Sequence, residues 1–169
     1  MSEATYLLAL GSNVRGRRGG PAAAVRAAMD AFGPDLANAS PIIASAPLGP
    51  SARRYANAAV LVRSALPPPA MLTRAKAMER AFGRRAGRRW GARVLDVDLV
   101  LWSGGNWRSK GLIVPHPSFR GRDFVLRPAA AIAPRWRDPV TGLTIRHLLA
   151  RLTRPRPLSR PGASDAVGP

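Results

Sequence analysis

The chain has 169 residues, no cysteine, and 27 Lys and Arg side chains against 9 Asp and Glu, a formal charge of +18 at pH 7. This length suits one domain with a single buried core. The lack of cysteine excludes a disulfide framework and a thiolate metal site, and it agrees with a reducing cytoplasm. No long apolar run predicts a transmembrane helix, and "MSEATYLLALGSN" lacks the basic flank of a signal peptide. We therefore expect a cytoplasmic protein without a membrane partner. We also expect a monomer.

The positive charge is almost entirely arginine, because Lys76 and Lys110 are the only lysines. Ala, Gly and Pro are abundant as well, so most scattered arginines are attributed to codon composition. The dense run "GRRAGRRWGAR" is different, because clustered arginines favour a polyanionic partner. That partner is either nucleic acid or the phosphates of a nucleotide.

The first half of the chain alternates strand and helix patterns. "TYLLAL", residues 5–10, predicts a buried strand that ends at the turn residues Gly11-Ser12-Asn13. "PAAAVRAAMDAF", residues 21–32, is Ala-rich with an initial proline and predicts a helix. A short strand is expected near residues 42–43, and "YANAAVLVR", residues 55–63, predicts a long one.

The second half begins with a helix that three prolines open at residue 67 and that Gly83 stops after about Phe82. "VLDVDLVLW" predicts a third central strand, "GGNW" a turn, and "GLIVPHPSFRGRDFVLRP" a strand followed by a loop. "AAAIAPRW" and "TIRHLLARL" predict short helical pieces. The expected fold is α+β, with helices packed on a mostly antiparallel sheet, in a domain over residues 1–152. Residues 153–169 have almost no apolar content and predict a disordered basic tail.

Two carboxylates stand one residue apart in the third of these strands. Asp96 and Asp98 would lie about 6.6 Å apart on one face, from a rise of ~3.3 Å per residue. That separation lets both reach one metal ion or a pair of ions. The alternative is that nearby arginines neutralise both on a solvated face. Strict alternation divides the strand into one face of Asp96, Asp98, Val100 and Trp102 and another of Leu95, Val97, Leu99 and Leu101.

An arginine cluster directly precedes this strand. Guanidinium groups bind phosphate oxygens through paired hydrogen bonds and keep their charge. Carboxylates for Mg²⁺ beside arginines for phosphate form the combination that phosphoryl transfer requires. The cluster consists of Arg84, Arg85, Arg88, Arg89 and Arg93.

Three further side chains are weaker candidates. His116 lies between two prolines, which restrict its backbone, but a lone loop histidine is more often structural. Tyr55 and Asn57 share one face of their strand and would suit a flat, nitrogen-rich ring. Plain packing and edge polarity explain them equally well at this point.

Taken together, these motifs resemble the 6-hydroxymethyl-7,8-dihydropterin pyrophosphokinase family of folate biosynthesis. The similarity runs from about Tyr6 to Leu152 through "LALGSN", "PLGP", "YANAAV", "E…GRR", "RRWGARVLDVDLVLW", "VPHPSF", "RDFVLRP" and "IAP". It implies a ferredoxin-like α+β sandwich that transfers the pyrophosphoryl group of ATP to the pterin's hydroxymethyl oxygen and releases AMP. It also implies Mg²⁺, in the form of two ions.

The resemblance assigns roles residue by residue. Asp96 and Asp98 match the metal-binding aspartates and, with Arg84 and Arg93, the catalytic set. The expected ATP-binding residues are Arg84, Trp90, Arg93, His116 and Arg122. The expected pterin-binding residues are Ser45, Leu48, Tyr55, Asn57 and Phe124.

Some positions depart from the family pattern. Ala86 stands where a second arginine is usual, which leaves Arg85 or Arg88 to replace it. Ala92 stands where proline is usual, and the loop over residues 49–55 is short. These departures concern turnover and loop closure, because residues 84–93 are expected to be mobile and to close over ATP. Both expected metal-binding aspartates, Asp96 and Asp98, are present.

Two competing functions remain at this stage. A nucleic-acid-binding module would explain the charge, but it gives no role to the paired aspartates, which would repel phosphates without a metal. An inactive relative would be expected to lack a metal ligand or a phosphate-binding arginine, and neither loss is seen. We therefore expect ATP and the pterin as partners and no specific nucleic acid.

Overall fold

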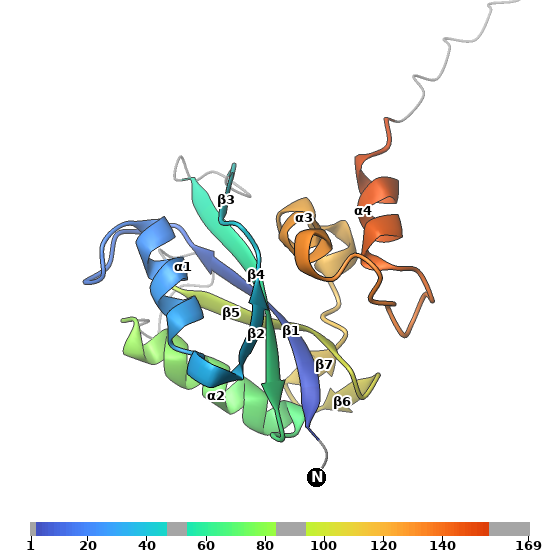
Figure 1. Ribbon diagram of the computed structural model, residues 1–169, viewed down its shortest axis with the longest axis horizontal. Helices are drawn as coiled ribbons and strands as arrows, with labels where there is room; N and C mark the ends of the chain where they lie inside the picture. Colours follow the sequence, from blue (N-terminus) through green and yellow to red (C-terminus); the bar gives the residue numbers. More distant parts are fainter. Residues whose placement is uncertain (1–2, 47–53, 84–93, 156–169) are drawn as a thin grey trace, which may run out of the picture.

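The computed structural model describes residues 3–46, 54–83 and 94–155, which form an antiparallel sheet with helices on both faces (Figure 1). The strands are β1 Ala4–Ser12, β2 Leu36–Ala39, β3 Ile43–Ser45, β4 Tyr55–Ser64, β5 Asp96–Trp102, β6 Trp107–Ser109 and β7 Leu112–Val114. The α-helices are α1 Pro21–Asp30, α2 Pro68–Ala81, α3 Asp123–Ile132 and α4 Ile145–Thr153, and short 3-10 turns cover Gly33–Asp35 and Phe119–Gly121.

The main sheet has the strand order β2-β4-β1-β5, with β3 also paired to β4, while β6 and β7 form a separate hairpin. All pairings in the described ranges are antiparallel. The chain path β1-α1-β2-β4-α2-β5 is the ferredoxin-like β-α-β-β-α-β arrangement. The predicted α+β class is therefore confirmed. The prediction that β5 is central is wrong, because in the described part of the chain it pairs only with β1 and forms an edge.

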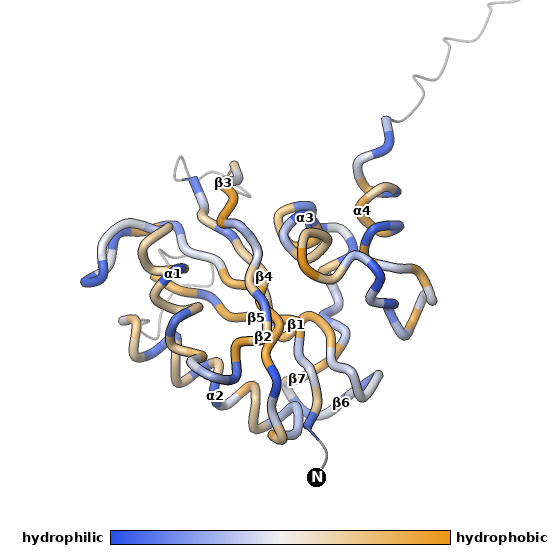
Figure 2. The backbone as a smooth tube through the Cα atoms, in the orientation of Figure 1, coloured by the Kyte–Doolittle hydropathy of each residue, from blue (hydrophilic) through white to orange (hydrophobic). Residues whose placement is uncertain are grey.

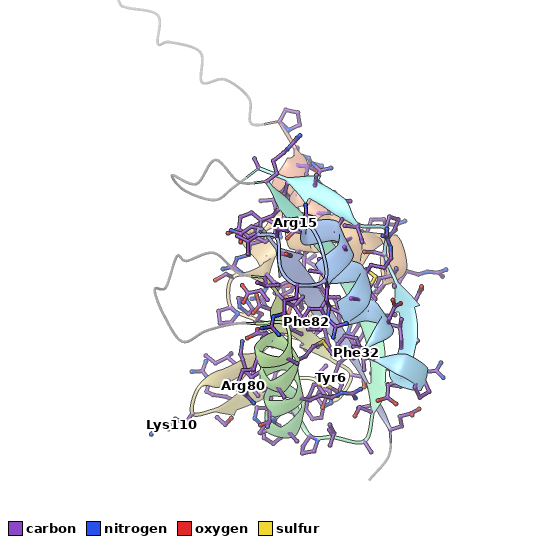
Figure 3. All side chains as sticks on the ribbon, turned by 90° about the vertical axis from the view of Figure 1, so that its left-hand side faces the viewer. Tyr6, Arg15, Phe32, Arg80, Phe82 and Lys110 are labelled. Atoms are coloured by element: carbon purple, nitrogen blue, oxygen red, sulfur yellow. The ribbon has the colours of Figure 1, made fainter. Side chains whose placement is uncertain are left out.

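One face of the sheet packs against α1 and α2. Alternate residues Tyr6, Leu8 and Leu10 of β1 join Val25 of α1 and Met71 of α2 in this first core. Figure 3 views the molecule from the side of α1 and α2 and labels three aromatic members of this core, Tyr6, Phe32 and Phe82.

The opposite face packs against α3, and α4 packs in turn on α3. Leu7 and Ala59 of the sheet meet Leu126 of α3 and Leu148 of α4 in this second core. The hydrophobic stretches of the strands lie between the helical layers (Figure 2). This second face also carries the candidate site.

A bulge interrupts the alternation of β5. Leu7 of β1 lies opposite Leu101, whereas Leu8 lies opposite Leu99, so Val100 is an extra residue. Beyond the bulge the faces exchange. Leu101 was predicted on the face opposite to the aspartates, but it lies on their face, in the second core beside Leu7.

Trp102 is displaced by the same bulge. It was predicted on the face of the aspartates, but it lies on the other face, where its ring stacks 6.4 Å from that of Tyr6. Trp107 meets Trp102 edge-on at 5.9 Å, and Gly104 lies so close to Trp102 that a Cβ there would clash with the ring. The predicted alternation is thus confirmed through Val100, which lies in the second core on the face of the aspartates, and it is wrong for Leu101 and Trp102.

Helix α3 corrects the predicted loop after "VPH". It begins at Asp123, ends at Ile132 and includes Pro128, a residue that usually interrupts a helix. Proline removes one helical hydrogen bond, but burial of Val125, Leu126 and Ala129 against the sheet holds the helix together. The helix therefore carries Phe124 in its first turn.

The other differences are small. β1 continues through Gly11 and Ser12, which were predicted as a turn, and β2 was not predicted because "LANA" has little apolar pattern. The helices near residues 21–32 and 67–82 and the strand over 55–63 are confirmed, and Gly83 ends α2 with a positive φ of 96°. Residues 156–169 of the predicted tail lie outside the described residues, so the domain boundary stays a prediction. Among the described helices, each is too short or too polar to span a bilayer.

Candidate active site

The site begins with a row of residues across three strands. Gly11 of β1 lies opposite Asn57 of β4 on one side and opposite Asp96 of β5 on the other. Residues opposite one another in an antiparallel sheet share a face. A Cβ at Gly11 would approach the Asn57 Oδ1 to 3.3 Å, so glycine leaves room for that amide. The amide and the carboxylate therefore share a face, with no side chain between them.

The next row repeats this pattern with smaller side chains. Ala9 lies opposite both Ala59 and Asp98. Asp96 and Asp98 therefore point to one face, as predicted, and Asn57 points to the same face. This is the face of the sheet that α3 covers.

Asp98 lies beside the cation that precedes α3. Its Oδ2 is 3.8 Å from the Nη1 of Arg122, and the two side chains are 35% and 33% exposed. Burial raises the pKa of Asp98, repulsion from Asp96 raises it further, and the neighbouring His116, Lys76 and Arg122 oppose that rise. The negative charge of Asp98 is thus only partly compensated by the described groups around it.

His116 is held in one orientation by the backbone. Its N–H donates to the Val100 carbonyl at 3.0 Å, and its Nδ1 accepts the N–H of Ser118 at 3.2 Å. Burial lowers the pKa of His116, Asp98 opposes the change, and Arg122 adds to it. A neutral ring with an occupied Nδ1 carries its proton on Nε2, so it can donate a hydrogen bond to an anionic oxygen.

A cavity of about 370 Å³ opens beside Asp98, between α2, β5 and the β6-β7 hairpin. This volume is in the range of small-molecule sites. Apolar side chains form most of the wall, while Lys76, Asp98 and His116 bring polar groups to it. The lining residues are Leu72, Lys76, Val97, Asp98, Leu99, Ser109, Gly111, Leu112, Ile113, His116 and Pro117.

A second set of predicted residues comes from β3, β4 and α3. Asn57 is 5% exposed, and its Nδ2 donates to the Ser45 Oγ at 2.7 Å. Ser45 lies opposite Tyr55 across the β3-β4 pair. Phe124 packs against the second core, with the guanidinium of Arg122 5.9 Å from its ring centroid. The predicted pterin residues that the structure describes therefore line the same face as the aspartates.

The remaining predicted site residues are not described. Leu48, Arg84, Trp90 and Arg93 lie outside the described residues, and so do the rest of the arginine cluster, Ala86 and Ala92. Their assigned roles, and the predicted closure over residues 84–93, stay predictions.

Sequence reasoning assigned no role to Lys76, nor to Glu79, although Glu79 is the acid of the "E…GRR" motif. Glu79 has no exposed surface and follows Met71 and Ala75 on the buried stripe of α2 at a spacing of four residues. An acid at a core position of a helical pattern is the signal that could have revealed it. Lys76 lines the cavity and pairs with Glu79.

The described residues fit a Mg²⁺ site made by two carboxylates. Within residues 3–46, 54–83 and 94–155, no group of three or more His, Cys, Asp or Glu side chains could hold a metal. Mg²⁺ is usually held by one or two carboxylates and takes its other ligands from water and phosphate. A cation here would also relieve the repulsion that raises the pKa of Asp98.

Several known proteins are similar to this chain in sequence. Curated relatives named 2-amino-4-hydroxy-6-hydroxymethyldihydropteridine pyrophosphokinase are 40% identical in Synechocystis, 37% in Pseudomonas aeruginosa and 34% in Mycobacterium tuberculosis. The alignments cover 62%, 78% and 95% of this chain, and 53%, 82% and 87% of the relatives. The chain thus spans about half the length of the Synechocystis relative.

Solved structures support the fold. Wild-type HPPK-DHPS from Plasmodium falciparum matches 89% of this chain with a TM-score of 0.67 and 13% identity, and a triple mutant matches with a TM-score of 0.69 and 14% identity. This chain corresponds to 41% and 44% of those two longer chains, respectively. The sequence model of the protein family described as 7,8-dihydro-6-hydroxymethylpterin-pyrophosphokinase (HPPK) matches residues 7–134. Because this match spans most of the described fold and includes both aspartates, the chain belongs to the HPPK family.

Proposed function

We propose that this protein transfers the pyrophosphoryl group of ATP to the hydroxymethyl oxygen of 6-hydroxymethyl-7,8-dihydropterin, in folate biosynthesis. A bond forms between that oxygen and the β-phosphorus, the bond from the β-phosphorus to the α,β-bridging oxygen breaks, and AMP leaves. The hydroxyl proton is released. One observation carries the proposal: Asn57 and Asp96 flank Gly11 on the same face of the sheet.

The pterin half of the proposal rests on Asn57 and two aromatic rings. The Asn57 Nδ2 donates to Ser45, which orients the amide and leaves its Oδ1 to accept from the edge of a bound ring. Tyr55 and Phe124 supply aromatic faces on β4 and α3, the elements beside this amide. A flat heterocycle with donors along its edge suits such a slot.

The nucleotide half rests on the cavity and on three nitrogen-bearing side chains near Asp98. Apolar walls suit a base, and Lys76, His116 and Arg122 suit phosphate oxygens. Bound between Asp96 and Asp98, Mg²⁺ would neutralise phosphate charge and orient the reacting group. Arg84, Trp90 and Arg93 complete the proposed phosphate contacts by resemblance alone.

The cellular setting belongs to the proposal as well. We infer a cytoplasmic monomer that requires two Mg²⁺ ions and has no specific nucleic-acid partner. The burial of Asp98 beside Asp96 favours an enzyme over a nucleic-acid-binding module. A protein that binds nucleic-acid phosphates gains nothing from two adjacent anions.

The direct test is AMP formation by the purified protein. We expect AMP when ATP, Mg²⁺ and the hydroxymethyl pterin are all present, and only background without any one of them. A pterin lacking the hydroxyl group is the matched control, because it can bind but has no oxygen to accept the transferred group. AMP formation at equal rates with and without the hydroxymethyl pterin would exclude the proposed reaction.

A further inference from the structure

A buried carboxylate lies behind the strand that carries the two aspartates. The Glu79 side chain has no exposed surface. Its Oε1 accepts the N–H of Val97 at 2.9 Å and a hydrogen bond from the Lys76 Nζ at 2.8 Å. Val97 is the residue between Asp96 and Asp98.

The contact with Val97 matters because β5 is an edge. In the described part of the chain β5 pairs with β1 on one side only, so its other side depends on partners outside the sheet. Glu79 reaches that side from α2 and holds the backbone between the two aspartates. A charged acceptor makes a stronger bond with an N–H than a neutral one does.

The contact with Lys76 places a cation at the cavity. The Lys76 side chain is 38% exposed and lines the cavity together with Asp98 and His116. Lysine has a long flexible side chain, so its ammonium needs a fixed partner to stay in one position. Glu79 is that partner, and it is itself immobilised by burial.

We propose that Glu79 is a positioning residue: through Val97 it holds Asp96 and Asp98 in the geometry that binds Mg²⁺, and through Lys76 it holds a phosphate-binding cation at the cavity. The inference rests on the proposed function, because it assumes that Mg²⁺ and a nucleotide bind at these groups. A purely structural role would instead tie α2 to the sheet and affect stability alone.

Two variants separate the linked contacts. Glu79→Leu removes both acceptor and charge, so we expect faster amide exchange at Val97. We also expect the Mg²⁺ concentration for half-maximal binding of a non-hydrolysable ATP analogue to rise about tenfold or more, the usual effect of losing a residue that orients a metal ligand. Lys76→Met keeps the contact with Val97, so it should weaken analogue binding at saturating Mg²⁺ by about tenfold and leave the Mg²⁺ dependence unchanged.

The matched control is Asp35→Asn. The Asp35 carboxylate pairs at 2.7 Å with Arg74, which belongs to α2 as Glu79 does. Neither Asp35 nor Arg74 lines the cavity, so removal of the Asp35 charge should change neither binding measurement. Unchanged Mg²⁺ dependence in a folded Glu79→Leu variant of lower stability would overturn the proposal.

A conservative variant decides the matter if Glu79→Leu does not fold. Glu79→Gln keeps an oxygen for Val97 but has no charge for Lys76, so analogue affinity should fall about as far as in Lys76→Met. Wild-type affinity in Glu79→Gln would reject the role assigned to the pair. These measurements follow binding, so failure of the wild type to form AMP would reject the proposed function separately.

Discussion

At the scale of single residues, Asp98 has an environment that opposes its own charge. Burial and the neighbouring Asp96 both raise its pKa, and the Nη1 of Arg122 is 3.8 Å from its Oδ2. A group whose pKa is higher in the folded protein contributes less to stability as pH rises through that pKa. Such an arrangement favours the binding of a cation over the stability of the metal-free fold.

The first prediction follows from this conflict between binding and stability. Asp98→Asn removes a charge that repels Asp96 and leaves a side chain of the same size. The Tm of the metal-free protein at pH 7 should therefore be equal to or above that of the wild type. Activity should fall at least about 100-fold, because even residues that only orient metal ligands cost 10–100-fold when lost. Calorimetry and AMP formation check the two halves. Near wild-type turnover in Asp98→Asn or in Asp96→Ala would show that the two-carboxylate site is wrong.

A second prediction concerns the pterin slot. Asn57→Ala should weaken pterin binding by about 1–3 kcal/mol, because it leaves polar groups of the ring unpaired in a desolvated place. Phe124→Ala should cost less, about 0.5–1.5 kcal/mol beyond the lost burial. Titration calorimetry with the pterin and, as control, with an ATP analogue checks both variants. Equal losses for the two ligands would mean that these residues do not form a separate slot.

At the scale of elements, one ion pair fixes the layer that carries His116 and Arg122. Arg120 lies in the short turn Phe119–Gly121, and its Nε and Nη2 both donate to the Asp138 carboxylate at 2.7 Å. Asp138 has no exposed surface and also accepts from the Thr141 hydroxyl and the Val140 N–H. The pair therefore ties the α3-α4 connection to the segment that holds two site residues.

The third prediction uses the titration of Asp138. Burial alone would raise the pKa of Asp138, but the hydrogen bonds from Arg120, Thr141 and Val140 outweigh it and lower that pKa. The carboxylate therefore stabilises the fold above its unfolded pKa of about 3.9, and that contribution is lost as pH falls through the lower folded pKa. Asp138→Asn should thus be destabilising at pH 7, and its difference from the wild type should shrink in acid. Urea unfolding at a series of pH values measures this difference.

Arg120→Gln provides the complementary variant, since it leaves a buried carboxylate without its cation. We expect a loss of about 3–5 kcal/mol at pH 7, the usual cost of breaking a buried pair. Arg127→Gln is the control, because its ion pair with Asp123 has both side chains more than half exposed and should change stability by less than about 1 kcal/mol. Similar losses of stability in both variants would contradict the role given to the Arg120–Asp138 ion pair.

At the scale of the whole molecule, the charge of +18 comes almost entirely from arginine. Several described arginines pack on aromatic rings, such as Arg18 over Phe82 at 4.6 Å and Arg74 over Phe32 at 5.5 Å. These guanidinium groups therefore contribute to packing as well as to the net charge. The total charge alone predicts some non-specific binding to polyanions at low salt.

The fourth prediction separates this background from function. Deleting the residues after Leu152 removes Arg154, Arg156 and Arg160 together with Asp165, a net loss of two positive charges. Catalysis should be unchanged, and any binding to DNA should be weak, strongly salt-dependent and reduced by the truncation. Filter binding at several salt concentrations, beside the AMP assay, measures both. Sequence-specific DNA binding that persists at physiological salt would reverse the order of the hypotheses.

Much of the site was predictable from local pattern. The period of two in a strand is a local property, so it correctly put Asp96 and Asp98 on one face without knowledge of any partner strand. The helix limits near Pro68 and Gly83 were predictable for the same reason, because proline and glycine constrain their own backbone. The motif resemblance added roles to positions that pattern alone left open.

Tertiary structure decided the rest, because register and docking depend on residues far apart in the chain. The extra residue Val100 turns Trp102 to the other face, and nothing in "DVDLVLW" signals it. Gly11 entered the sheet because Asn57 and Asp96 flank it on neighbouring strands, although its local sequence predicts a turn. Glu79 reaches Val97 across 18 positions only because α2 packs beside the open edge of β5. Local chemistry thus determined which groups could act, and long-range packing determined which of them meet.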